Sequence, residues 1–247
     1  RGLGDVYKRQ TLQYFNSQID LIIMKLKFAS RMSYIKASEI REILKVTEQE
    51  DVISFAGGLP APELFPVDEI NEVNQIVLKE AGTKALQYTT TEGYAPLREW
   101  ISQRMNDRLG TSFDKDNILI THGSQQGLDL SGKVFLDNGD IVLCESPTYL
   151  AAISAFKSYG CSFVEIPTDE EGMNMAVLED VLNKTENIKL IYVIPTFQNP
   201  TGRTWSLERR KKLAELSARY DIPVIEDNPY GELRFEGESL PSIKSFD

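Results

Sequence analysis

The sequence has few cysteines, a single histidine and no long apolar run. Its two cysteines, Cys144 and Cys161, cannot build a disulfide-rich scaffold, and both lie in strand-like runs. We therefore expect two buried thiols in a cytoplasmic protein. The lone His122 has no partner residues for a metal site, so we expect a turn residue and no metal. No apolar run approaches the ~20 residues of a membrane span, so no membrane partner is expected.

The sequence also lacks a basic excess and the two best-known glycine-rich phosphate motifs. Lys and Arg number 27 against 37 Asp and Glu, which gives a net charge of −10. That balance argues against nonspecific binding to nucleic acid. There is no GxGxxG, and the nearest approach to a Walker A loop, residues 127–134, lacks its Ser/Thr and falls in a predicted helix.

What is present is the composition of a globular protein, with 41% hydrophobic and 26% charged residues. Residues 1–10 resemble a translated adapter sequence and residues 11–23 have no clear period, so 1–23 is expected to be a non-native leader before a start at Met24 or Met32. We expect residues 24–67 to form an N-terminal arm and small-domain segment. Residues 68–247 would form a large domain cut off at its C-terminus.

Hydrophobic periodicity predicts an α/β fold. Helices are expected over Ser38–Lys45, over Asp68–Ala81 with Asp68 as N-cap, and over Leu97–Leu109. Beyond residue 117 strands and helices alternate, with a further strand-like run at 232–235. The strands are expected near 117–121, 140–144, 161–167, 188–194 and 222–226, and the helices near 124–137, 148–159, 175–185 and 206–220. Such alternation predicts a mostly parallel sheet with helices on both faces.

Polar motifs follow four of these strands directly. In open α/β sheets, ligands bind outside the carboxyl ends of the strands, so four such loops can build one site. The loop Gly123-Ser-Gln-Gln-Gly127 opens a helix, whose free amides and dipole suit a phosphate. A plain turn with Ser124 as N-cap would explain the same residues.

The other three loops offer groups for a flat, charged ligand. Tyr149 could stack on a ring, Asn199 could donate to a phenolate oxygen, and Asp227 could pair with a protonated ring nitrogen. Taken singly, these residues could equally be a packing aromatic, a turn residue and a structural carboxylate. Together with the phosphate cradle they are the set that pyridoxal 5′-phosphate (PLP) requires.

Six motifs carry a resemblance to a known family. They are Ile53-Ser-Phe-Ala-Gly-Gly-Leu-Pro60, Gln87-Tyr-Thr-Thr-Thr-Glu-Gly-Tyr94, Gly123-Ser-Gln-Gln-Gly127, Glu145-Ser-Pro-Thr-Tyr149, Asn199-Pro-Thr-Gly202 and Glu226-Asp-Asn-Pro-Tyr230. From about Met24 the chain resembles the N-terminal part of a class I/II, fold-type-I, PLP-dependent aminotransferase. It is most similar to the 2-aminoadipate/kynurenine group and to the aminotransferase-like domains of MocR regulators.

The resemblance implies a role for each matching residue. Ser124 and Gln125 would bind the phosphate, Tyr149 would stack on the ring, Asn199 and Tyr230 would bond the ring oxygen, and Asp227 would pair with the ring nitrogen. Tyr88 would reach the phosphate of a neighbouring subunit, which implies a homodimer. Gly58, Arg41 and Asn199 would face the substrate. The bonds Ser146–Pro147 and Asn199–Pro200 are expected to be cis, as in aspartate aminotransferase-like relatives.

One family feature is missing from these residues. The Schiff-base lysine of the family lies in a Ser-x-x-Ser-Lys motif, which is absent, and Lys244 in Ile243-Lys244-Ser245 does not match it. Lys244 is expected to be a surface residue, and the chain itself to be inactive. The parent protein is expected to transfer an amino group between an amino acid and a 2-oxo acid. A MocR-type sensor domain and a PLP lyase or decarboxylase on the same fold are the alternatives.

Overall fold

The computed structural model describes residues 27–35, 52–53 and 58–247. Its strands form one five-stranded sheet in the order β3-β2-β1-β4-β5. The strands β1 (Ile141–Ser146), β2 (Ser162–Asp169), β4 (Ile188–Val193) and β5 (Val224–Glu226) run parallel, and the short β3 (Gly172–Met173) runs antiparallel to β2. The mostly parallel α/β sheet predicted from periodicity is confirmed.

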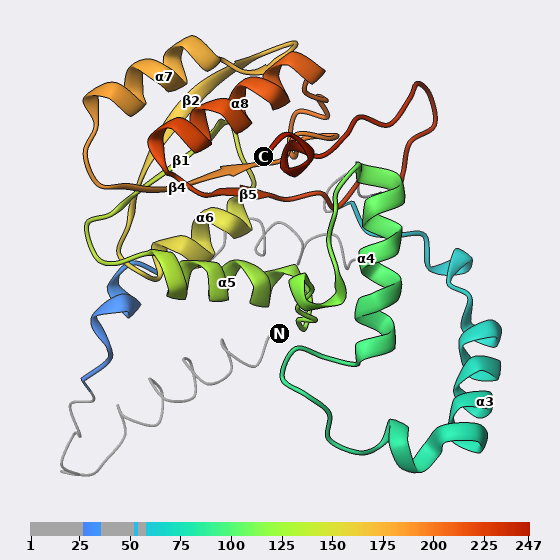
Figure 1. The fold of residues 1–247 in the computed structure, drawn as a ribbon. Helices are drawn as coiled ribbons and strands as arrows, with labels where there is room; N and C mark the ends of the chain where they lie inside the picture. Colours follow the sequence, from blue (N-terminus) through green and yellow to red (C-terminus); the bar gives the residue numbers. More distant parts are fainter. Residues whose placement is uncertain (1–26, 36–51, 54–57) are drawn as a thin grey trace, which may run out of the picture.

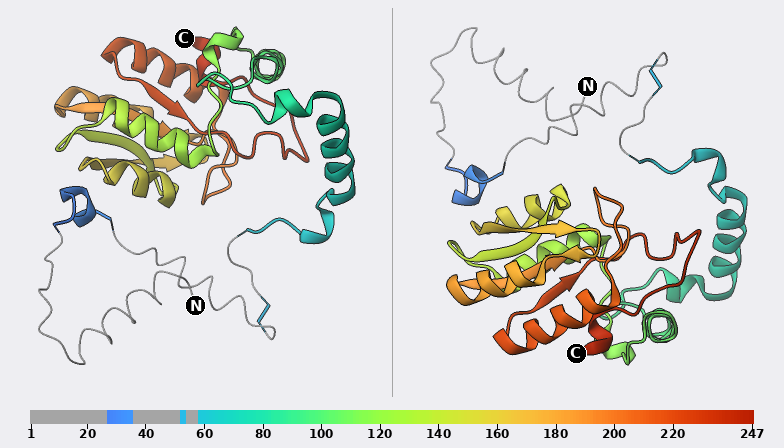
Figure 2. Two further views of the ribbon diagram at one scale, coloured as in Figure 1. Left: turned by 90° about the horizontal axis from the view of Figure 1, so that it is seen from below. Right: turned by 90° about the horizontal axis from the view of Figure 1, so that it is seen from above.

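Helices cover both faces of this sheet, as predicted (Figures 1 and 2). α7 (Met175–Lys184) and α8 (Leu207–Tyr220) lie on one face, and α5 (Ser124–Phe135) and α6 (Leu150–Lys157) on the other. Each face has its own apolar core. Leu143, Ile191, Leu178 and Leu213 belong to the first, and Val142, Leu190, Leu128 and Phe156 to the second. Burial of each such side chain contributes about 1.5–3 kcal/mol, so both helix layers are held by β1 and β4.

The remaining elements are η1 (Ser30–Ser33), η2 (Pro62–Leu64), α3 (Val67–Ala85), α4 (Ala95–Leu109), η3 (Lys115–Asn117) and η4 (Ile243–Phe246). Arg98 connects α4 to the segment that contains η3. It donates to the Ile118 carbonyl at 2.9 Å and to Asp116 at 3.1 Å. α3 stands away from the sheet and buries none of its residues (Figure 1). No described helix is long and apolar enough to cross a membrane.

Several sequence expectations are wrong in detail. Asp68 is not an N-cap, because α3 begins at Val67 after Pro66 and Asp68 lies in its first turn. The predicted strand near 117–121 is instead η3 followed by an extended segment. In that segment the Ile120 amide donates to the Glu92 carbonyl rather than to a neighbouring strand. Without a ladder partner, an apolar run of strand-forming residues stays extended but is not a strand.

Residues 232–235 also form no strand, because the Leu233 amide turns back to the Tyr230 carbonyl at 2.9 Å. No local pattern predicted β3, which is only two residues long. The helix expected over Ser38–Lys45 lies outside the described residues. The helix expected to end at Ala81 continues to Ala85, with non-helical backbone at Ala81 itself. The other helices and strands agree with expectation to within about two residues.

Candidate cofactor site at the carboxyl ends of the strands

Three loops leave the carboxyl ends of β1, β4 and β5 on the same edge of the sheet. They carry Tyr149, Asn199 and the pair Asp227 and Tyr230. The peptide bonds Ser146–Pro147 and Asn199–Pro200 are both cis, as expected. The parallel register of β1, β4 and β5 therefore assembles residues that lie up to about 80 positions apart in the chain.

The N-terminus of α5 offers unsatisfied backbone donors. The helix begins at Ser124, its N-cap is Gly123 with φ +77°, and no side chain caps it among the described residues. Gln126 folds back instead, and its side-chain oxygen accepts from the His122 amide at 2.6 Å. A Cβ added at Gly123 would meet nothing within 4 Å. The exposed Ser124 and Gln125 thus stand beside free amides on an open surface, which suits an anion.

Tyr149 lies at the start of α6 with its ring half-buried against the core. Its neighbour Thr148 is buried, and the Thr148 hydroxyl has no hydrogen-bond partner among the described residues. A buried hydroxyl without a partner is unfavourable, so this orphan atom supports a polar ligand beside Tyr149.

Asn199 and Tyr230 come together from different loops. The Asn199 Nδ2 amide lies 3.3 Å from the Tyr230 hydroxyl. Gln198 holds the loop in place, since its Nε2 donates to the Pro147 carbonyl at 2.8 Å and its Oε1 accepts from the Thr201 amide at 2.9 Å. The pair can therefore present two donors to one oxygen of a bound ring.

Asp227 is half-buried just after β5 and is held on two sides. Its amide donates to the Val193 carbonyl at 2.9 Å, and its Oδ2 accepts from the Tyr192 hydroxyl at 2.8 Å. Tyr192 is 1% exposed. Burial and the Asp227 carboxylate raise the pKa of Tyr192 well above its ordinary value, so its hydroxyl remains a donor. One oxygen of Asp227 is thus committed to Tyr192, and the other is available to a ligand.

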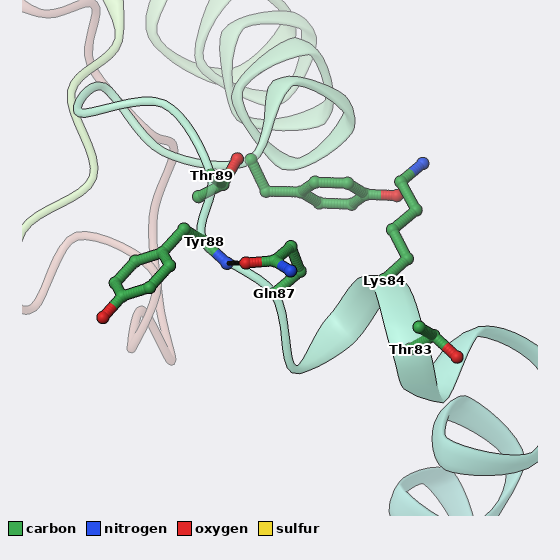
Figure 3. A pocket seen from close by; sticks show the side chains of 6 residues that line it. Thr83, Lys84, Gln87, Tyr88 and Thr89 are labelled. Carbon is green, nitrogen blue, oxygen red and sulfur yellow. Dashed lines mark hydrogen bonds between the residues drawn. The ribbon is translucent and has the colours of Figure 1, made fainter.

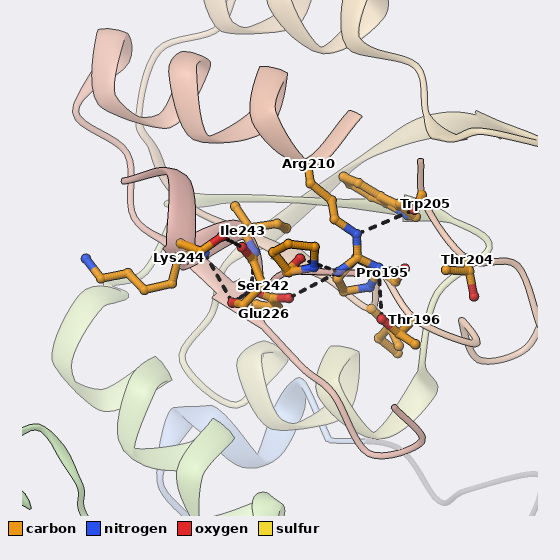
Figure 4. Close-up of polar contacts among 12 residues, drawn as sticks. Pro195, Thr196, Thr204, Trp205, Arg210, Glu226, Ser242, Ile243 and Lys244 are labelled. Carbon is orange, nitrogen blue, oxygen red and sulfur yellow. Dashed lines mark hydrogen bonds and ion pairs between the residues drawn. The ribbon is translucent and has the colours of Figure 1, made fainter. Parts of the chain in front are cut away.

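A buried polar network connects the bases of these loops (Figure 4). The Arg210 guanidinium on α8 donates to the Pro195 carbonyl at 2.7 Å and to the Thr196 hydroxyl at 2.9 Å. Its Nη1 lies 3.8 Å from a carboxylate oxygen of Glu226, the residue before Asp227. Burial raises the pKa of Glu226 and lowers that of Arg210. The network ties the Asn199 loop to the end of β5.

The resemblance implies roles for three further residues. Tyr88 is 98% exposed and lines an open hollow of about 420 Å³ with Thr83, Lys84 and Gln87 (Figure 3). Gly58 is exposed with φ +55°. Arg41 lies outside the described residues. The roles of Tyr88, Gly58 and Arg41 stay predictions.

The expectations for Cys144, Cys161 and Lys244 are confirmed. Cys144 and Cys161 are buried free thiols, and burial raises their pKa values to about 12 and about 11. Lys244 is exposed and pairs with Asp247. His122 lies exposed in a bend, and no group of three potential metal ligands occurs among the described residues.

Sequence reasoning missed the supporting residues Tyr192, Glu145, Gln198 and Arg210. Glu145 and Gln198 were visible as polar residues beside the motifs. Tyr192 was visible as a polar-tipped side chain within the apolar run 190–194. Arg210 gave no signal, since a charged residue on an amphipathic helix is ordinarily solvated.

Comparison with known proteins gives the family. The model for aminotransferase class I and II matches residues 50–246. Aromatic-amino-acid aminotransferase 1 of Thermococcus litoralis is 51% identical over 224 residues, which are 89% of this chain and 54% of that protein. The chain spans about half the length of the curated relatives it matches.

Solved structures agree with the family match. Pyrococcus horikoshii kynurenine aminotransferase, in complex with PMP, KYN and KYA, has a TM-score of 0.83 and 46% identity, covering 89% of this chain and 55% of its own. The alpha-aminoadipate aminotransferase of Thermus thermophilus, complexed with N-(5'-phosphopyridoxyl)-L-leucine, has a TM-score of 0.77 and 44% identity, covering 88% and 53%. The sheet is that of PLP fold type I, and the chain belongs to the aminotransferase class I and II family.

Proposed function

We propose that the whole protein transfers an amino group between an amino acid and a 2-oxo acid with pyridoxal 5′-phosphate as cofactor. The observation that carries this proposal is the convergence of Asp227 with the Asn199–Tyr230 pair at one sheet edge. A carboxylate and two neutral donors match the ring nitrogen and ring oxygen of the cofactor. When bound, PLP supplies an electron sink for the electrons of the substrate Cα–H bond.

The residues of this chain would bind and orient the cofactor. The α5 amides with Ser124 and Gln125 would take its phosphate, and Tyr149 would stack on its ring. Asn199 and Tyr230 would donate to the ring oxygen. Asp227, steadied by Tyr192, would hold a proton on the ring nitrogen. The orphan Thr148 hydroxyl and the open α5 N-terminus fit this ligand.

The substrate class is proposed from the relatives' names. Aromatic amino acids, kynurenine and 2-aminoadipate are the donors that those names print. We propose that Gly58 and Arg41 contact the substrate, with Asn199 beside them. Tyr88 would reach the phosphate held by a second copy in a cytoplasmic homodimer. Its full exposure leaves it free to do so.

The chain itself has no Ser-x-x-Ser-Lys motif, so we propose that it holds cofactor contacts without the lysine that forms the Schiff base. The proposed function is tested with the whole protein, incubated with each of the three donors and 2-oxoglutarate. Formation of glutamate with at least one donor, dependent on added PLP, is expected. No amino transfer with any donor, together with no PLP retained after gel filtration, would refute it.

A further inference from the structure

Glu145 lies between the two ends of the Asn199 loop. This residue on β1 is 1% exposed. Its Oε2 accepts from the Ile194 amide at 2.8 Å, and its Oε1 accepts from the Trp205 indole Nε1 at 2.8 Å. Ile194 directly precedes the loop 195–204, and Trp205 directly follows it. A single carboxylate on the neighbouring strand thus joins the entry and the exit of this loop.

Further hydrogen bonds hold the rest of the loop 195–204. The Trp205 amide donates to the Pro195 carbonyl at 2.8 Å, so the loop is narrow at its base. Nearer the tip, Gln198 donates to the Pro147 carbonyl, two residues beyond Glu145. Asn199 is the next residue. Two of the contacts that position Asn199, those of Glu145 and of Gln198, therefore lead back to the end of β1.

The two partners of Glu145 are both donors without acceptor capacity. A carboxylate can accept from both, one on each oxygen. A protonated carboxyl carries a hydroxyl whose proton needs its own acceptor and whose oxygen accepts more weakly. The two contacts are therefore complete only in the ionised form. Burial opposes that form and raises the pKa of Glu145 to about 7, although the hydrogen bonds from Ile194 and Trp205 act to lower it.

Other ionisable groups lie on the elements around Glu145. They include Cys144 on β1, Glu165 on β2, Tyr192 on β4, Arg210 on α8, Glu226 on β5 and Asp227 after β5. Burial raises the pKa of Cys144 to about 12 and that of Tyr192 further, so neither ionises near neutrality.

We propose that Glu145 is a positioning residue that holds both ends of the loop 195–204, and so places Asn199, only while its carboxylate is ionised. The consequence for the cofactor rests on the proposed function, because Asn199 matters to a bound ring only if the ring binds there. The contact of ionised Glu145 with the two ends of the loop is tested without any cofactor.

Trp205 reports directly on its own contact with Glu145. The chain has two tryptophans, of which Trp205 is 0% exposed and Trp100, on α4, is 56% exposed. In a Trp100→Phe background the emission of Trp205 is expected to titrate with a midpoint near pH 7. Glu145→Gln should abolish that titration. The matched control Glu165→Gln removes a carboxylate from the adjacent strand and should leave the titration in place.

A second measurement needs no substitution at Glu145. Ile194 is buried, and its amide donates to the Glu145 carboxylate. In the unaltered chain, hydrogen exchange at this amide, corrected for the intrinsic rate, should be at least threefold less protected at pH 6 than at pH 8. This result decides the matter even if Glu145→Gln does not fold. A pH-independent Trp205 emission with constant Ile194 protection would overturn the proposal.

Pyridoxamine 5′-phosphate then tests the link to Asn199, because this probe needs no lysine. Its Kd for the chain is expected to rise about tenfold in Glu145→Gln and to stay unchanged in Glu165→Gln. An unchanged Kd in Glu145→Gln would overturn the positioning role. If neither the unaltered chain nor any variant binds the probe, the proposed function fails. The Trp205 titration and the Ile194 exchange still decide whether ionised Glu145 holds the two ends of the loop.

Discussion

The Tyr192 hydroxyl donates a 2.8 Å hydrogen bond to Oδ2 of Asp227, across the pairing of β4 with β5. The two residues are separated by 35 positions in sequence. The bond fixes one carboxylate oxygen and leaves the other to face a ligand. A buried tyrosine in the sheet core thus orients the charged group of the candidate site.

Removing that donor should weaken the site without unfolding the chain. In the whole protein, Tyr192→Phe is expected to lower turnover about tenfold, because loss of a hydrogen bond to a charged group costs about 1.5 kcal/mol. Tyr220→Phe is the matched control, since it removes a hydroxyl that bonds Asn183 at the surface. Equal turnover of the two variants in a steady-state assay would contradict the role of Tyr192.

Asp227 should be far more sensitive than its partner. Asp227→Ala in the whole protein should reduce amino transfer by about 100-fold or more, since losing a buried charge-assisted hydrogen bond costs about 3 kcal/mol. The ring nitrogen would lose its proton and the ring its capacity to accept electrons. Unchanged far-ultraviolet circular dichroism should accompany the loss. Near wild-type turnover would refute the assignment.

Asn199 and Tyr230 should behave as a coupled pair, because their side chains touch at 3.3 Å. The single variants Asn199→Ala and Tyr230→Phe should each weaken binding of pyridoxamine 5′-phosphate. The double variant should lose less than the sum, with a coupling energy of about 0.5–1 kcal/mol. Isothermal titration of the four proteins gives this value. Strict additivity would mean that the two side chains do not share a ligand atom.

The ionisation of Glu145 should shape stability as a function of pH. Its pKa is raised from 4.5 to about 7 in the folded chain, so between these values the folded state binds the proton more tightly than the unfolded state. The free energy of unfolding should therefore fall as pH rises from about 4.5 to 7, by roughly 3 kcal/mol from this group. Urea titrations at pH 5 and pH 8 give the change in the free energy of unfolding between these two pH values. That fall should be larger in wild type than in Glu145→Gln by about this amount. Parallel pH profiles would contradict the prediction.

Gly172 should resist substitution more than a comparable glycine. It has φ +111°, and an added Cβ would lie 2.5 Å from the Trp205 ring. Gly139 has φ +92° with nothing within 4 Å of an added Cβ. Gly139→Ala should cost about 1–2 kcal/mol for the backbone alone. Gly172→Ala should cost about 1–3 kcal/mol more for the clash. Chemical denaturation measures the loss of unfolding free energy in each variant. Equal losses would show that the Trp205 side chain moves aside at no cost, and would contradict the prediction.

Much of the fold follows from local pattern. The alternation of apolar strands with amphipathic helices beyond residue 140 predicts the parallel sheet, because each element must bury its apolar side against another. The segment 118–121 has the same local pattern and forms no strand, since strand formation also needs a partner. Local pattern cannot supply that partner.

The candidate site also has one part that the sequence predicts and one part that only the tertiary structure shows. Asp227, Asn199 and Tyr149 could be named from the sequence because they follow apolar strands directly, and parallel pairing brings strand ends to one edge. Their supporting contacts could not be named. Tyr192 meets Asp227 across 35 positions, Glu145 meets Ile194 across 49, and Glu145 meets Trp205 across 60. Hydrogen bonds at such separations leave no periodic signal. They exist only because the register of β1, β4 and β5 brings buried donors and acceptors within reach, and a buried polar group must find its partner there.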